Sequence, residues 1–127
     1  MSKENKWFIF ADEDWIMAKR ALEDGIFNQT CFHSQQGVEK LLKGFLQDSK
    51  KKIPKTHSLV ELLNLCAGIN STLANIEEDC IKLDRYYIPT RYPDALPGTL
   101  PEGLPSKKDA ETALAILDKV AKLIKKD

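Results

Sequence analysis

The sequence contains no apolar segment long enough to cross a membrane. Its apolar runs all fall well short of the roughly 20 residues that a transmembrane helix needs. The N-terminal sequence MSKENKWFIFADED has one short apolar patch followed by acidic residues, and it lacks the long apolar stretch and small-residue cleavage site of a secretory signal. We therefore expect a cytoplasmic protein that does not enter a membrane.

Cysteine and histidine are scarce, and their spacing argues against a metal site. The chain has three cysteines and two histidines, and no two cysteines form a Cys-x-x-Cys pair. Isolated cysteines within apolar helical patterns are usually small core residues in a reducing compartment. We therefore expect no metal ion and no other cofactor, and we place Cys31, Cys66 and Cys80 in the core.

The charge balance excludes a strong overall electrostatic field. The 127-residue chain carries 19 basic and 19 acidic residues, so its net charge is zero. Proteins that bind nucleic acid through their overall charge are strongly basic, and any RNA contact here must come from a local patch. The length suits one domain with its own core, which we expect to span residues 1–127.

Sustained alternation of polar and apolar residues, the pattern of a half-buried strand, is also absent. Apolar residues recur instead at intervals of three and four over residues 7–22 and again over residues 28–46. Asp24 and Gly25 end the first of these segments, and a polar run over residues 48–52 ends the second. Both segments are predicted to be helices.

Further helices are predicted after a lysine- and proline-containing loop at residues 50–54. Ser58 and Glu61 have the spacing of a capping box, and Ser106 stands in the same relation to Asp109 at the start of the last helix. Residues 68–71 separate the third helix from a fourth. We predict an all-α protein, a four- to five-helix up-and-down bundle with a long Pro-rich loop before the last helix.

That loop, residues 85–105, holds five of the six prolines and all the tyrosines. Its candidate binding residues are Arg85, Tyr86, Tyr87, Arg91 and Tyr92. Proline at every fourth position prevents a continued helix. In one interpretation the segment is a passive strap whose tyrosines cover a gap between helices. In the other, the guanidinium groups bind phosphate and the tyrosine rings offer faces to a base.

The second predicted helix carries a polar stripe beside its apolar face. Gln36, Glu39 and Lys43 follow one another at spacings of three and four. They either solvate the bundle, with Glu39 and Lys43 as an ordinary ion pair one turn apart, or line a shared groove that binds a ligand. His57 precedes the next helix, where it either bonds locally or acts as a weak candidate for catalysis. No other residue is a catalytic candidate.

Three segments together resemble the HEPN domain family of small helical proteins. They are CFHSQQGVEKLLKGFL at residues 31–46, THSL at 56–59 and YYIPTRYPDA at 86–95. The resemblance implies a helical bundle, commonly dimeric. It also implies either a nucleotide- or substrate-binding partner of a minimal nucleotidyltransferase or a metal-independent ribonuclease toxin.

The ribonuclease members of the family carry an arginine followed after four to six residues by a histidine. Here the positions after Arg85 hold Thr90, Arg91 and Tyr92, and those after Arg91 hold Leu96, Pro97 and Gly98. The usual general base is therefore missing. We expect a binding module rather than an enzyme, acting with a nucleotidyltransferase subunit in a toxin–antitoxin-type pair. The alternative is an endoribonuclease with a displaced active site that uses His57.

The expected partners are a second copy of the chain, a minimal nucleotidyltransferase subunit, and a nucleotide or RNA. The homodimer is expected from the resemblance and from four aromatic residues near one end of the first helix. These are Trp7, Phe8, Phe10 and Trp15. Together they exceed what one small core can bury.

Overall fold

The computed structural model describes residues 5–87 and 103–125, and within these ranges it contains helices and their connections. The elements are α1 (Lys6–Glu23), α2 (Phe27–Asp48), α3 (Leu59–Ala67), the short 3₁₀ helix η1 (Ser71–Ile76), α4 (Glu77–Asp84) and α5 (Lys107–Ile124). The predicted all-α bundle is therefore confirmed. No helix in the described ranges is long and apolar enough to span a bilayer.

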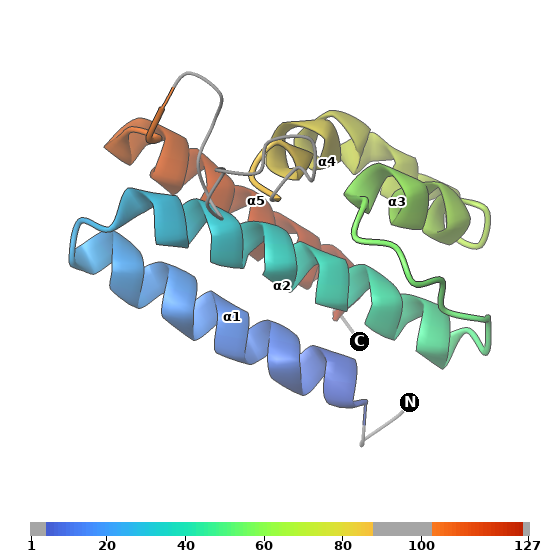
Figure 1. Cartoon of the computed structure of the whole chain (residues 1–127). Coiled ribbons are helices and arrows are strands. Elements are labelled where there is room, and N and C mark those ends of the chain that lie inside the picture. Colours follow the sequence, from blue (N-terminus) through green and yellow to red (C-terminus); the bar gives the residue numbers. More distant parts are fainter. Residues whose placement is uncertain (1–4, 88–102, 126–127) are drawn as a thin grey trace.

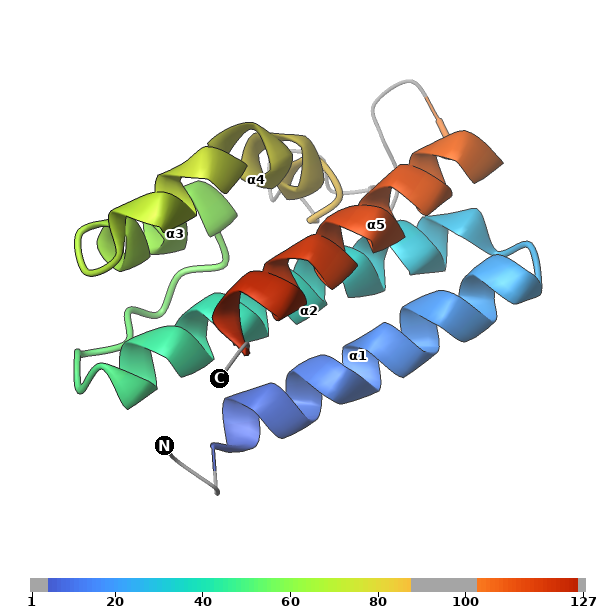
Figure 2. The ribbon, with the colours of Figure 1, turned by 180° about the vertical axis from the view of Figure 1, so that it is seen from behind.

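Helix α2 lies at the centre of the bundle. Helices α1 and α5 pack along it, and the α3–α4 pair covers a further side (Figure 1). The view from behind shows α5 lying across α2 on the side away from α3 (Figure 2). Because α2 is covered by so many elements, more than half of its 22 residues are buried, polar ones included.

The direction of α3 is set by the loop that precedes it. This loop returns along α2, so that His57 lies beside Gln35 and Cys66 lies beside Leu42. Helix α3 therefore runs in the same direction as α2, whereas α1 is antiparallel to α2 (Figure 1). The loop brings His57 onto the edge of the central helix.

The ends of the helices follow the sequence signals closely. Gly25 adopts a left-handed φ of 77° between α1 and α2, a conformation that glycine takes without strain. The capping box of α5 is complete, since Ser106 Oγ accepts from Asp109 N and the Asp109 carboxylate accepts from Ser106 N. The predicted single fourth helix is instead η1 followed directly by α4.

The cap of α3 differs from the predicted capping box. Ser58 Oγ accepts from Glu61 N at 3.2 Å as expected. The carboxylate of Asp84, at the end of α4, accepts from the backbone N–H groups of Leu59 and Val60 at 2.8 and 3.2 Å. Burial raises the pKa of Asp84, although these bonds oppose the shift. An acid distant in sequence thus completes the cap.

Close helix contacts depend on two glycines of α2. A Cβ atom on Gly37 would lie 2.7 Å from Leu117 Cδ1 of α5, and one on Gly44 would overlap the Phe8 ring of α1. Both flanking helices therefore approach the α2 backbone more closely than any larger residue would allow.

Candidate functional site

The polar stripe of α2 forms a buried ion pair at the edge of the helix. Glu39 and Lys43 are 4% and 6% exposed, and Lys43 Nζ lies 3.0 Å from Glu39 Oε2. The ammonium group also lies 5.5 Å from the centroid of the Trp7 ring of α1. The sequence leaves open whether this stripe solvates the bundle, with an ordinary ion pair, or lines a shared groove. Burial makes each charge dependent on the other, because an unpaired buried charge is costly.

His57 is hydrogen-bonded to the carboxylate of this ion pair. Its Nδ1 lies 3.3 and 3.2 Å from the two carboxylate oxygens of Glu39. Because an ionised carboxylate only accepts hydrogen bonds, Nδ1 donates and Nε2 of a neutral ring is left as an acceptor. The side chain is 53% exposed. Glu39 therefore holds an accessible imidazole in a defined orientation.

The Tyr87 ring stacks on one face of the His57 imidazole. The two rings stack with their centroids 4.7 Å apart and an interplanar angle of 17°. Tyr87 lies just beyond the end of α4, whereas His57 precedes α3, so the stack joins two connections of the bundle. We call His57 and Tyr87 the ring platform.

Two glutamines fix the loop that carries His57. Gln35 is fully buried, and its Nε2 donates to the backbone carbonyl of His57 at 3.1 Å. Its Oε1 accepts from Gln36 Nε2 at 2.7 Å, and Gln36 also approaches Glu39 Oε1 at 3.5 Å. The predicted residues Gln36, Glu39 and Lys43 thus converge with His57 on one site.

The residues predicted at the end of α4 separate into different environments. Tyr86 is 4% exposed, and its hydroxyl bonds the thiol of Cys31, while burial raises the pKa of Tyr86. Its ring is held in the core and offers no face to a ligand. Arg85 is exposed. Arg91 and Tyr92 lie outside the described residues.

A second carboxylate–histidine pair lies between α1 and α2. Asp14 is 6% exposed, and its two oxygens lie 2.8 Å from His33 Nδ1 and 2.6 Å from Lys40 Nζ. Both histidines are therefore held at Nδ1 by a buried carboxylate that also binds a lysine of α2. This cluster was not predicted from the sequence. The available signal was an acid at position 14, within the otherwise small apolar series Ala11, Ala18 and Ala21.

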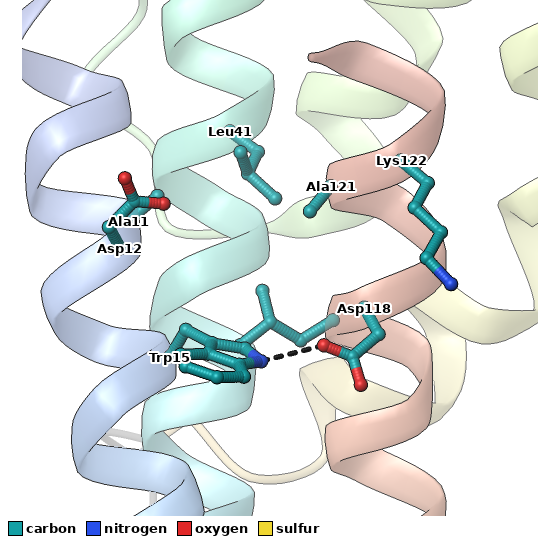
Figure 3. Close-up of a pocket in the computed structure, with 8 residues that line it drawn as sticks. Ala11, Asp12, Trp15, Leu41, Asp118, Ala121 and Lys122 are labelled. Carbon is teal, nitrogen blue, oxygen red and sulfur yellow. Dashed lines mark hydrogen bonds between the residues drawn. The ribbon is translucent and has the colours of Figure 1, made fainter. Parts of the chain in front are cut away.

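A hollow lies between α1 and α5, and a hydrogen bond and an ion pair connect the two helices beside it. Its volume is about 240 Å³, and Leu41 and Ala121 contribute to its apolar lining (Figure 3). Trp15 Nε1 donates to Asp118 Oδ1 at 2.6 Å across it (Figure 3), and the ion pair Lys125–Asp12 at 2.6 Å joins the same two helices. The side chains around this hollow mainly hold α1 against α5.

The thiols are chemically inert. Cys31, Cys66 and Cys80 are free and buried, as expected from the sequence, and burial raises the pKa of each to about 12. Reactive cysteines have the opposite shift. In the described part of the chain, no three His, Cys, Asp or Glu side chains are grouped closely enough to hold a metal ion.

Comparison with known proteins assigns the fold to a family. The family model of the HEPN domain matches residues 5–127. None of the proteins with curated functions is significantly similar to the chain. The resemblance seen in the residue motifs is therefore confirmed over almost the whole chain.

Similar crystal structures include an archaeal HEPN homologue, which is 28% identical with a TM-score of 0.78 and covers 99% of this chain and 98% of its own. A protein from Thermus thermophilus is 29% identical with a TM-score of 0.81 and the same coverage. A HEPN domain protein from Thermotoga maritima is 25% identical with a TM-score of 0.75, and 95% of each chain is covered.

Proposed function

Because the chain belongs to the HEPN domain family, we propose that it is a non-catalytic module that binds a nucleotide or a short RNA segment. The observation that carries the proposal is the ring platform of His57 and Tyr87. Its imidazole is 53% exposed, is held at Nδ1 by the buried carboxylate of Glu39 and stacks on Tyr87. Such a platform is rigid before the ligand arrives, which lowers the entropic cost of binding.

Stacking is the contact that a flat, fixed pair of rings can make with any base. A base placed on the exposed face of His57 would extend the existing stack with Tyr87. Base–aromatic stacking contributes on the order of 1–3 kcal/mol per base and tolerates different bases. Gln36, which approaches Glu39 Oε1 at 3.5 Å beside the platform, would supply a polar group for the ligand. Arg91 and Tyr92 remain proposed ligand contacts on sequence grounds.

We further propose that the chain acts together with a minimal nucleotidyltransferase, as a toxin–antitoxin-type pair. The support is the family resemblance of the segments at residues 31–46 and 86–95. In this arrangement the helical chain holds the substrate and the second subunit performs the transfer. A binding module of this kind needs no general base of its own.

The ring platform is tested by titrating wild type and variants with ATP, a short single-stranded RNA and any minimal nucleotidyltransferase encoded next to this chain. Isothermal calorimetry should show that Tyr87→Ala weakens binding of ATP or RNA by about tenfold, as expected for the loss of one stacking contact. Tyr87→Phe keeps the ring and should bind like wild type.

The matched control is Ile81→Ala, which removes an exposed apolar side chain from the helix that precedes Tyr87. It should leave the affinity unchanged. Equal affinity of wild type and Tyr87→Ala for every titrant would contradict the platform. Absence of binding by wild type to all three titrants would contradict the proposed function.

A second candidate function is favoured by the Glu39–His57 pair. A carboxylate at Nδ1 fixes the tautomer and orientation of an imidazole that acts at Nε2, which is how a general base is usually prepared. In the alternative, His57 would take over the role of the missing motif histidine in a metal-independent ribonuclease. The paired residue Lys43 supplies a nearby positive charge, although Glu39 already balances it.

Cleavage of a labelled single-stranded RNA in the presence of EDTA distinguishes the two candidates. We expect no cleavage above buffer by wild type. The comparison uses His57→Ala and, as the control, His33→Ala, because His33 is held by Asp14 in the same way. If wild type and His33→Ala cleave the RNA and His57→Ala does not, the ribonuclease hypothesis is correct and the non-catalytic binding module is rejected.

We also propose a homodimer formed through α1. Of the four aromatic residues near its start, Phe10 is 45% exposed, and Ile9, Ile16 and Met17 expose 51%, 44% and 52% of their surface on the same helix. On the same helix, Glu13 lies three residues before Ile16, and Arg20 lies three residues after Met17. Two α1 helices packed antiparallel about a two-fold axis between Ile16 and Met17 would place each Glu13 opposite the other copy's Arg20.

Multi-angle light scattering tests this face. Wild type should have twice the chain mass of 14.4 kDa at micromolar concentration. Met17→Lys should be monomeric, because it buries a charge at the centre of the contact. Leu65→Lys introduces the same charge at a similarly exposed position of α3 and should remain dimeric. A monomeric wild type, or a dimeric Met17→Lys variant, would refute the proposed contact.

A further inference from the structure

A polar hollow of about 290 Å³ opens between the end of α4 and the start of α5. It is distinct from the ring platform, because neither His57 nor Tyr87 lines it. The polar side chains that line the hollow are Lys82, Arg85, Lys108, Asp109 and Thr112. Three of these are cations, in a chain whose net charge is zero.

Neither lysine of the hollow is ion-paired with an acid in the described ranges. Lys82 and Lys108 make no hydrogen bond or ion pair with any residue in the described ranges. By contrast, Lys119 is paired with Asp79 at 2.8 Å. The one acid of the hollow, Asp109, accepts the backbone N–H of Ser106 at 2.9 Å as part of the α5 cap.

The donors converge from two helices. Lys82 and Arg85 are three residues apart and share one side of the last turn of α4. Lys108 lies in the first turn of α5, and the Thr112 hydroxyl follows one turn later. The ammonium groups of Lys82 and Lys108 act as point charges toward a phosphate, and the Arg85 guanidinium, which already has a partner, adds positive charge to the same hollow. This is a donor set for an oxyanion.

The helix dipole of α5 contributes in a secondary way. The N-terminal end of this 18-residue helix carries a partial positive charge, which favours an anion nearby. Of its first-turn N–H groups, that of Asp109 is engaged by Ser106 Oγ in the capping box. The side chains of the hollow are the main donors in the proposed recognition.

We propose that this hollow is a phosphate-binding site that takes a phosphate or diphosphate group of the ligand. Its volume lies at about the lower limit for ligand pockets, which suits one or two phosphate groups and not a whole nucleotide. The inference rests on the proposed function, because it locates the phosphates of a nucleotide or RNA. The bases of these ligands are assigned to the ring platform.

The test is calorimetric titration with inorganic pyrophosphate at low salt. The variant is Lys82→Gln combined with Lys108→Gln, which removes two cations and keeps the polarity of the side chains. It should weaken pyrophosphate binding by about tenfold or more, because hydrogen bonds to charged groups are lost. Binding by wild type should also weaken as salt is raised.

The control is Lys51→Gln combined with Lys52→Gln. These lysines line another hollow, of about 380 Å³, whose other lining residues include Leu46, Leu65 and Ile69. The control has the same change in net charge and should bind pyrophosphate like wild type. An equal loss in both double variants would show only non-specific attraction, and absence of pyrophosphate binding by wild type would also overturn the site.

Competition identifies the source of the phosphate. Displacement of pyrophosphate by ADP supports a free nucleotide, and displacement by a short RNA without terminal phosphate supports the RNA backbone. Displacement by neither would overturn the inference. The proposed function is judged separately: ATP or RNA binding that is lost in Tyr87→Ala but unchanged in the Lys82/Lys108 double variant would retain the platform and reject the hollow.

Discussion

The carboxylate of Glu39 is the contact on which the candidate site depends. It is buried on the central helix, pairs with the equally buried ammonium of Lys43, and receives Nδ1–H of His57. Removing two such charges from water costs several kcal/mol per ion, and this cost is offset only when each charge is paired and hydrogen-bonded. The geometry around Glu39 meets that requirement. A neutral or misplaced side chain at position 39 would leave Lys43 without its counter-ion.

The contacts around Glu39 extend to the rest of the bundle. Gln35 holds the loop of His57 against α2, and Asp84 caps α3 from the end of α4. The same end of α4 supplies Tyr87 to the ring platform. The two rings of the platform lie in connections next to helix ends, and polar contacts fix these helix ends. A binding site in a connection is held rigid in this way. The proposed phosphate-binding hollow is lined by Lys82 and Arg85 from the same end of α4.

Local features were predictable from the sequence, and tertiary ones were not. The helices and the Ser106–Asp109 cap follow from residue spacing, because they depend on neighbours within one or two turns. The Glu39–Lys43 pair was also visible at a spacing of four. The burial of this pair could not be predicted from the sequence, because it depends on how α3 and α1 cover α2. For the same reason the sequence left open whether Tyr86 covers a gap between helices or offers its ring to a base, and the capping of α3 by Asp84 was not foreseen.

A double-mutant cycle at positions 39 and 43 tests the role of the buried carboxylate most directly. Chemical denaturation of Glu39→Gln should show a loss of about 3 kcal/mol or more, because Lys43 is left buried and unpaired. Adding Lys43→Met should restore much of that loss. As a reference, Asp79→Asn at the more exposed Lys119 pair should cost less than about 1 kcal/mol. If Glu39→Gln costs no more than Asp79→Asn, and the second substitution restores nothing, the candidate site does not depend on this carboxylate.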